Sequence, residues 1–501
     1  MKRSKHTLSN YKLLTCDMGK LVPVGLQEAL PGDTFQLSSS AMIRVSPLAA
    51  PVMHPVTVRI HHFFVPHRLV WDKWEDFITG GPDGANADTW PKVTLDVNSG
   101  TNKGTCWDYY GVPVSNAGTG ADLPVSVVPI WGYNKIWNEY YRDQDLQAER
   151  AVDDGSVANI GWGKDYFTTA RPWTQKGPEI TLPLGTRAPV IGMGTPAAGY
   201  NFNLTNVASH EGGGEQRTYA TGAQVSSASP AQAMVVAQDD DHPGYPGIYA
   251  DLSAAGQLSI NDFRRGFALQ RYQEARARYG SRYTEYLRYL GVTPSDARLQ
   301  RPEYLGGGSC KINFSEVLQT AGVGVNPSRE DFGVGDLYGH GVAGMRHGSV
   351  RRFIEEHGYI HSFLSVRPKG IYMNGVHRTF LRETKEDFFQ RELQQIGQQE
   401  IWKAEIFAGD TTVPTVFGYQ DRYAEYRETP STVAGEYRNL LDYWHMARNL
   451  PASTALNEEF VKCVPTKRIH NVQTNDSLWC MVNNHVVARR LVSRNANSII
   501  L

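Results

Sequence analysis

Four histidines in the second half of the chain come nearest, by type and spacing, to a metal site: His340, His347, His357 and His361. The last two are four residues apart, and on a helix that spacing would let both imidazoles share a zinc ion. Apolar and polar residues alternate through the same segment, however, which predicts a strand. In a strand these two histidines lie about 13 Å apart. The sequence therefore predicts no metal ion and no other cofactor.

Motifs for nucleotide binding and catalysis are equally weak. Residues 339–344 have the Gly-x-Gly-x-x-Gly spacing of a dinucleotide-binding turn. The run 353–366 that follows has the periodicity of a strand, whereas such a turn must lead into a helix. The carboxylates of Glu383, Glu386 and Asp387 are typical of a solvated surface, and no two of them can be assigned as an acid and a base. We therefore expect that the protein is not an enzyme.

Composition excludes several further classes. Lysine plus arginine number 50 against 51 for aspartate plus glutamate, so any contact with a polyanion must come from a local patch. The sequence contains no run of 18 apolar residues that could insert into a membrane. Residues 1–15 lack the apolar centre of a signal peptide. The cysteines are odd in number and widely spaced, which favours buried free thiols in a cytosolic, soluble chain: Cys16, Cys106, Cys310, Cys463 and Cys480.

The elements that must position these residues are mainly strands. Val58, Ile60, His62 and Phe64 alternate with a second row of side chains, and Pro66 should end this strand. The same period recurs at 359–366 and 478–488. Strands near both ends of the chain, separated by long irregular connections, fit a two-sheet antiparallel sandwich whose first and last strands become neighbours.

Several blocks of the sequence resemble one family, the major capsid proteins of microviruses, which are small single-stranded DNA bacteriophages, and within them the gokushovirus-like branch. The most specific block is 296–308, with the sequence Asp-Ala-Arg-Leu-Gln-Arg-Pro-Glu-Tyr-Leu-Gly-Gly-Gly. Other matching blocks occur in family order along most of the chain: 11–19, 21–25, 30–34, 43–48, 50–55, 58–62, 74–81, 356–360 and 417–427.

The resemblance implies a fold and a function. It implies an eight-stranded antiparallel jelly roll of the viral capsid type, with large loop insertions that include one or two α-helices. Identical copies would form a T=1 icosahedral shell around a circular single-stranded DNA genome. Further partners would be an internal scaffolding protein, a DNA pilot protein and a receptor on the host surface. The protein would be assembled in the bacterial cytoplasm and reside in the virion.

We expect one jelly-roll domain over 1–501 with two notable insertions. Residues 186–247 are rich in Gly, Ala, Ser, Thr and Asn, contain too few large apolar residues for a core, and should form an exposed protrusion that serves host attachment. The alternative is a surface loop without a role. Residues 259–291 show helical periodicity with a capping-box-like start at Ser259 and Asp262, and Gly280 could divide this helix into two.

Arginine is the only cation on the polar side of that helix, which favours contacts of fixed geometry. Those contacts could be with a neighbouring subunit or with DNA, or the face could simply be solvated. The residues predicted for a subunit interface are Arg264, Arg265, Arg271, Arg276, Arg298, Arg301 and Tyr304. We expect the last three to be at least partly buried against a neighbour or against another part of the chain. The basic residues at the two ends are predicted to contact DNA: Lys2, Arg3, Lys5, Arg489, Arg490 and Arg494.

Aromatic residues, at 11%, support one alternative function. Sandwich proteins with exposed aromatic rows bind or cleave polysaccharides, so a carbohydrate-binding or glycosidase-like protein is the second hypothesis. Aromatic and arginine enrichment is also typical of large protein interfaces. Composition alone leaves both classes open.

Overall fold

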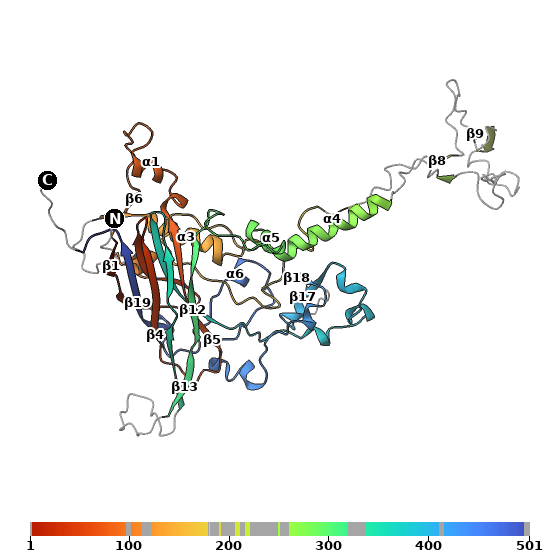
Figure 1. Ribbon diagram of the computed structural model, residues 1–501. Coiled ribbons are helices and arrows are strands. Elements are labelled where there is room, and N and C mark those ends of the chain that lie inside the picture. The colour runs from red at the N-terminus through yellow and green to blue at the C-terminus, as the bar shows by residue number, and fades with distance from the viewer. Residues whose placement is uncertain are drawn as a thin grey trace. The chain divides into compact units, whose positions relative to one another are not determined.

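The computed structural model describes most of the chain: residues 3–96, 102–112, 122–178, 180, 190–191, 206–210, 216–220, 249–250, 260–318, 337–409 and 415–494. The chain divides into two compact units, where the sequence predicted a single domain. The first consists of Met1–Thr174 together with Arg276–Leu501, and the second is Gln175–Ala275. In the described part of the chain all the sheets except two short strand pairs, β8 with β11 and β9 with β10, belong to the first unit (Figure 1).

A seven-stranded antiparallel sheet contains both ends of the chain. Its members, in order across the sheet, are β1 (Ser4–Thr7), β19 (Leu478–Arg490), β4 (Thr34–Val45), β14 (Leu337–Arg346) and β13 (Asn313–Leu318). Two more strands complete the sheet. β2 (Asn10–Cys16) pairs with another part of β19 than β1 does, and β15 (Val350–Phe353) pairs with another part of β4 than β14 does. The prediction that the first and last strands are neighbours is confirmed, because β1 and β2 both pair with β19.

A four-stranded antiparallel sheet forms the second layer. Its order is β12 (Glu303–Lys311), β5 (Val56–Pro66), β16 (Gly358–Pro368) and β3 (Leu21–Ala29). Ile60 and Leu364 of this sheet lie in one buried cluster with Ile43 and Val482 of the seven-stranded sheet. The two sheets therefore pack face to face, and the predicted β sandwich of the jelly-roll class is confirmed. The expected count of eight strands is exceeded in the described part of the chain, since short strands such as β1 and β2 continue one another along β19.

Side-chain alternation follows the predicted period of two. Along β19, buried and more exposed residues alternate from Leu478 to the last residue of the strand. In β5 the predicted row Val58, Ile60, His62 and Phe64 is buried, and the strand ends at Pro66 as expected. Residues of the opposite row, such as Phe63, are buried as well. They are buried because α3 (Val128–Ile136) covers that side of the four-stranded sheet, as the contact of Tyr133 with Phe363 at 5.5 Å shows.

The remaining elements are short and lie in the connections. The helices among them are η1 (His67–Leu69), α1 (Trp74–Thr79), α2 (Cys106–Tyr110), η2 (Trp137–Tyr141), η4 (Arg378–Phe380), η5 (Lys385–Asp387), η6 (Leu393–Gln395), η7 (Lys403–Glu405), η8 (Ala424–Tyr426), η9 (Gly435–Arg438), η10 (Asp442–Trp444) and α6 (Glu458–Val461). The strands are β6 (Lys92–Leu95) with β7 (Leu123–Ser126), β8 (Val190–Ile191) with β11 (Tyr249–Ala250), β9 (Asn206–His210) with β10 (Gln216–Ala220), and β17 (Gln398–Trp402) with β18 (Val416–Asp421).

The arginine-rich segment forms two helices, α4 (Ile260–Tyr279) and α5 (Tyr283–Tyr289). Gly280 separates them with a φ of 99°, so its predicted role as a break is confirmed. The proposed cap at Ser259 lies outside the described residues, as does nearly all of the predicted insertion 186–247, of which only β8, β9 and β10 are described.

All five cysteines are free, and all are buried except the half-buried Cys310. In the described part of the chain, no helix has the length and apolar character needed to span a membrane.

Candidate subunit and nucleic-acid interfaces

Arg301, from the family-specific block 296–308, is buried within its own chain. Its guanidinium lies 3.2 Å from the Glu139 carboxylate and 3.6 Å from that of Asp296. It also stands over the ring of Tyr140, 4.7 Å from the centroid. Only 11% of the Arg301 side chain is exposed, so a neighbouring subunit can reach little of it. The predicted burial is met here by another part of the same chain.

The other two residues of this prediction remain accessible in the single chain. Tyr304 is 45% exposed, although its ring meets His61 edge-on at 5.7 Å and Phe63 at 5.3 Å. Arg298 is exposed and lies in the turn before β12, so its own chain does not supply the predicted burial. Contact of Tyr304 and Arg298 with a neighbouring subunit stays a prediction.

The three glycines of the block allow β12 to lie close to its neighbours. Gly306 has a φ of 133° at a bulge in the pairing with β5. A Cβ on Gly307 would lie 2.1 Å from the backbone oxygen of Ile60, and one on Gly308 would lie 2.5 Å from Cβ of His347. The glycines thus serve close approach of strands within one chain.

We expect Gly307→Ala to lower the free energy of unfolding by about 1–3 kcal/mol, because backbone atoms cannot move aside for the added methyl group. The matched control is Gly348→Ala, where no atom lies within 4 Å of the new Cβ. That change should alter the free energy by less than about 0.5 kcal/mol. Urea unfolding of both variants provides the measurement. Equal midpoints for the two variants would show that the glycines are not needed for packing.

The predicted interface arginines on the long helix all point to solvent. Arg264, Arg265, Arg271 and Arg276 are exposed, and in this fully described helix Ala277 alone is buried. Large apolar side chains of α4 are exposed too, among them Phe263 at 43% and Phe267 at 66%. Several large apolar side chains of α4 are thus exposed in the part of the chain that the structure describes.

The basic residues at the chain ends do not form one group. Lys5 and Arg489 are exposed and lie directly opposite each other on β1 and β19. Arg490 points the other way and forms a 2.8 Å ion pair with the fully buried Asp33, so its assignment to DNA is corrected to a structural contact. Alternation along the strand causes this difference between neighbours.

Three assigned residues remain from the chain ends. Arg3 is exposed and stands over the ring of Phe353, with the guanidinium carbon 5.2 Å from the centroid. Arg494 is exposed beyond the end of β19. Lys2 lies outside the described residues.

Lys5 and Arg489 belong to a larger surface that the sequence reasoning missed. We call it the basic sheet face, and define it as the side chains of β1, β2, β4, β19, β14 and β15 that point away from the sandwich core. Register places further exposed cations on it, namely Arg44, Arg346 and Arg351. It also carries exposed apolar and aromatic residues: Tyr11, Leu13, Met42, Trp479 and Met481.

None of the strand positions on the basic sheet face is aspartate or glutamate. One carboxylate meets it at its end, where Asp476 accepts a hydrogen bond of 2.5 Å from Thr15. Like charges directly opposite each other, as in the Lys5 and Arg489 pair, destabilise a sheet. An anionic partner would remove that repulsion. The signal was present in the sequence as strand alternation, but only the register between distant strands brings these cations together.

A cavity of about 550 Å³ lies over the other sheet, beside the ends of β5 and β16. Its lining includes seven arginines and one lysine against three carboxylates. Lys164 and Arg171 are already paired with Asp143, at 2.6 and 3.5 Å.

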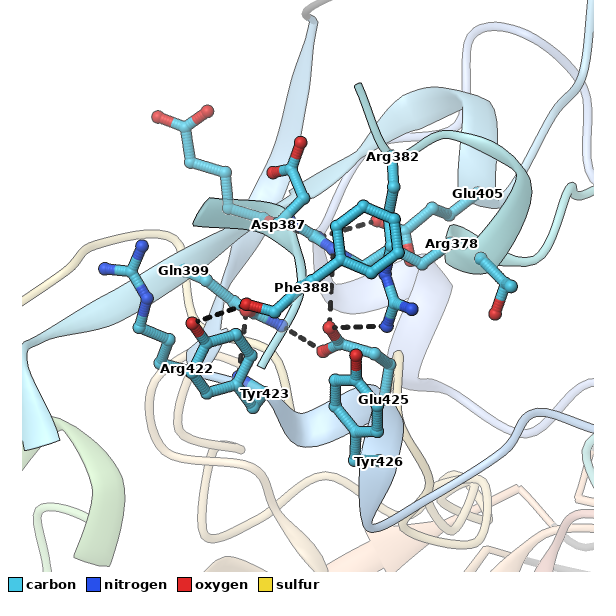
Figure 2. A network of polar contacts seen from close by, with 12 residues as sticks. Arg378, Arg382, Asp387, Phe388, Gln399, Glu405, Arg422, Tyr423, Glu425 and Tyr426 are labelled. Atoms are coloured by element: carbon cyan, nitrogen blue, oxygen red, sulfur yellow. Dashed lines mark hydrogen bonds and ion pairs between the residues drawn. The ribbon is translucent and has the colours of Figure 1, made fainter. Parts of the chain in front are cut away.

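A buried network of charged residues connects the 3-10 helices of residues 378–426 (Figure 2). Arg378 lies 3.1 Å from Glu405 and 3.9 Å from Glu425, and Arg382 lies 3.4 Å from Glu425. Each of these four side chains is at most 8% exposed. The Arg382 guanidinium also stands 4.6 Å from the ring of Tyr426, beside which it is drawn in Figure 2.

The network also fixes the hairpin of β17 and β18. Gln399 donates to Glu425 at 2.6 Å and accepts from the backbone nitrogen of Tyr423 at 2.9 Å. Burial raises the pKa of Glu405, although the positive charge of Arg378 opposes that effect. Every charged group here has a charged partner inside the protein, so we assign the network a structural role.

The histidines do not form a metal site. The Nε2 atoms of His347 and His62 are instead 2.7 Å apart. Nδ1 of His361 forms a 2.8 Å hydrogen bond with the hydroxyl group of Tyr110. Within the described ranges, no group of three or more potential ligands could hold a metal ion. Residues 339–344 lie inside β14, consistent with the rejection of a dinucleotide-binding turn.

Known proteins similar to this chain are phage capsid proteins. The family model described as "Capsid protein (F protein)" matches residues 1–495. Capsid protein VP1 of Bdellovibrio phage phiMH2K is 34% identical over 92% of this chain and 88% of its own length. Capsid proteins VP1 of Chlamydia phage 1 and Spiroplasma virus 4 are each 30% identical over 92% of this chain. The matched regions cover 89% and 87% of the lengths of these two relatives.

These matches confirm the resemblance drawn from the sequence blocks, including the gokushovirus-like branch. They decide between the two function classes left open by composition, because the family and its relatives are structural proteins of capsids and not enzymes. The chain therefore belongs to the phage capsid protein (F protein) family of the microviruses, and it is a structural major capsid protein of the virion.

Proposed function

We propose that identical copies of this chain assemble into a closed T=1 icosahedral shell that encloses a circular single-stranded DNA genome. The carrying observation is the basic sheet face, which combines exposed cations with exposed aromatic rings and has no acidic strand position. Cations neutralise phosphates and rings stack on unpaired bases, which is how proteins hold single-stranded nucleic acid without reading its sequence.

Contacts between copies are proposed to involve the long helix. The exposed arginines Arg264, Arg265, Arg271 and Arg276 share α4 with the exposed rings of Phe263 and Phe267. Central aromatic residues with surrounding arginines are the composition of tightly packed interfaces. Tyr304 and Arg298, which remain accessible, are proposed to join such contacts. In a closed shell the contacts must be heterologous and must close about rotation axes.

Further partners are proposed from the family resemblance. An internal scaffolding protein and a DNA pilot protein would act during assembly in the bacterial cytoplasm. Residues 186–247 would form the protrusion that contacts a host surface receptor, which their composition supports because they cannot build a core of their own.

A charge-reversal variant tests the shell and the DNA contact together. We expect Lys5→Glu, Arg351→Glu and Arg489→Glu combined to leave closed shells of normal size but to reduce the ratio of genome-filled to empty particles at least about tenfold, because several phosphate contacts turn repulsive. Sucrose-gradient sedimentation with electron microscopy measures both quantities. The control reverses three exposed cations elsewhere: Lys103, Lys385 and Arg391.

The two parts of the proposal fail in different ways. If the unaltered protein forms no closed shells in infected cells, the T=1 assembly is wrong. If shells form and the triple variant packages DNA as well as the control does, the assignment of the basic sheet face is wrong.

A further inference from the structure

The cavity over the four-stranded sheet has a charge arrangement that its own residues do not balance. Arg59 of β5 lies opposite Ser365 of β16, and Arg367 lies opposite Thr57. The two arginines are thus diagonal neighbours on one face of adjacent strands, and both line the cavity. Burial lowers the pKa of Arg367, and the positive charge of Arg59 adds to that effect. Two like charges are therefore held together beside an open volume.

Protein partners for these arginines are few. Arg367 donates to the backbone oxygen of Gly161 at 3.3 Å. Among the described residues no carboxylate forms an ion pair with Arg59, Arg367 or Arg142, and Nε of Arg142 is buried without any hydrogen-bond partner. A buried guanidinium nitrogen that lacks an acceptor costs free energy. The unpartnered donors therefore indicate an anion that is bound in the functional protein.

Three other cations of the lining already have carboxylate partners. Lys164 and Arg171 pair with Asp143, and Arg278 pairs with Asp421 at 2.8 Å. Arg59 is exposed, whereas Arg142 and Arg367 are half-buried, and no carboxylate among the described residues forms an ion pair with these three. The positive charge that has no carboxylate partner lies at one wall of the cavity. This wall is formed by β5, β16 and Arg142, the residue after η2.

The same side of the sheet, together with the adjoining η2, also provides aromatic rings. Tyr304 is partly exposed, and Tyr141 forms a 2.8 Å hydrogen bond with Nδ1 of His61. Burial lowers the pKa of His61 to about 4, so this imidazole is neutral at pH 7 and adds nothing to the positive charge that the arginines and Lys164 bring to the cavity. Rings beside arginines suit a ligand that carries a flat ring next to its anionic group.

We propose that this cavity binds a phosphate group, carried by a nucleotide whose base or sugar packs against Tyr304 and its neighbours. This site is separate from the basic sheet face and goes beyond the proposed function. A phosphate has enough oxygen atoms to accept paired hydrogen bonds from two guanidinium groups at once, whereas a carboxylate has only two oxygens. The volume of about 550 Å³ lies within the range of ordinary small-ligand sites.

The experiment measures binding by the purified full chain with titration calorimetry and thermal unfolding. The probes are inorganic phosphate, thymidine 5′-monophosphate, a short oligothymidylate and triglutamate. We expect the monophosphate to bind and to raise the melting temperature, and Arg59→Gln with Arg367→Gln to weaken this binding at least about tenfold. The matched control, Lys385→Gln with Arg391→Gln, changes two exposed cations outside the cavity and should bind normally.

The sign of the stability change separates a binding site from a packing role. Without ligand, the Arg59→Gln and Arg367→Gln variant should melt no lower than the unaltered protein, because it loses a repulsion. A lower melting temperature would contradict the proposal. So would tighter binding of triglutamate than of the monophosphate, which would indicate an acidic peptide. Binding of the oligonucleotide alone, equally in both variants, would place the phosphate contact elsewhere.

The probes also distinguish the source of the phosphate. If the monophosphate and inorganic phosphate bind as the proposal expects, a free nucleotide suffices. If the oligothymidylate binds more tightly than the monophosphate, and this difference in affinity disappears in the variant with Arg59→Gln and Arg367→Gln, the phosphate belongs to a DNA strand. Both results support a phosphate site, and neither depends on whether shells assemble.

Discussion

Replacement of Arg378 by methionine is expected to lower the free energy of unfolding by about 3–5 kcal/mol. The side chain is 7% exposed and lies between the carboxylates of Glu405 and Glu425. Methionine fills much of the volume but removes the charge, which leaves two buried carboxylates with Arg382 as their remaining cation. It also removes the donor to the backbone oxygen of Glu400. Urea unfolding followed by tryptophan fluorescence measures the change.

The control for this prediction is an exposed ion pair in the same part of the chain. Lys385 and Glu386 are 3.8 Å apart, and their side chains are 87% and 50% exposed. Solvent screens such a pair, so Lys385→Met should change the free energy by less than about 0.5 kcal/mol. A loss below about 1 kcal/mol for Arg378→Met would show that water reaches the network and that it does not hold the segment.

Strand periodicity was sufficient to predict the sandwich. The rows in β5 and β19 are visible in the sequence because one side of each strand meets the core. The same period, carried two residues further along β19, places Arg490 toward Asp33 and Arg489 toward solvent. Arg489 and Arg490 therefore face opposite sides of the sheet, although both are basic residues at the same end of the chain.

Other features required the folded chain. Arg301 and Glu139 are 162 residues apart in the sequence, and no local sequence pattern predicts their ion pair. The diagonal placement of Arg59 and Arg367 depends on the register of β5 against β16, which a single sequence does not specify. Electrostatic sites built from distant strands are therefore the part of this protein that sequence reasoning could not reach.

Acid should destabilise the protein strongly between pH 6.5 and pH 4. Burial is the first cause that lowers the pKa of five histidines: to about 4 for His54, His61 and His67, and to about 3 for His62 and His361. An unfolded histidine titrates near 6.5, so below that pH the unfolded chain binds protons that the folded chain does not. Stability is complete above pH 6.5 and is lost as the pH falls toward the folded values.

The expected size of this effect is about 1–2 kcal/mol for each histidine between pH 7 and pH 5. Two carboxyl groups oppose it, since burial raises the pKa of Glu405 and of Glu303 and the folded state then binds a proton more readily as the pH falls. The histidines outnumber them, so the net loss should reach several kcal/mol. Urea midpoints measured at pH 7, 6 and 5 report the slope.

His67 offers a variant that isolates one titrating group. Its ring packs among aromatic rings, 4.6 Å from Trp74, 4.7 Å from Tyr359 and 5.4 Å from Trp90, and its Nδ1 is buried without a hydrogen-bond partner. His67→Phe keeps a ring in this cluster and removes the proton-binding site. The variant should therefore lose about 1–2 kcal/mol less than the unaltered protein between pH 7 and pH 5.

The comparison for His67→Phe is His340→Gln, at an exposed histidine that contacts Ser315. This variant changes an exposed side chain and leaves the five buried histidines in place, so it should keep the full acid sensitivity. If both variants retained the same slope, the destabilisation would have to come from carboxylates instead. Because Asp and Glu titrate below about pH 5 in the unfolded chain, that origin would also move the transition to lower pH. The pH at which stability begins to fall thus identifies the responsible groups independently of any single substitution.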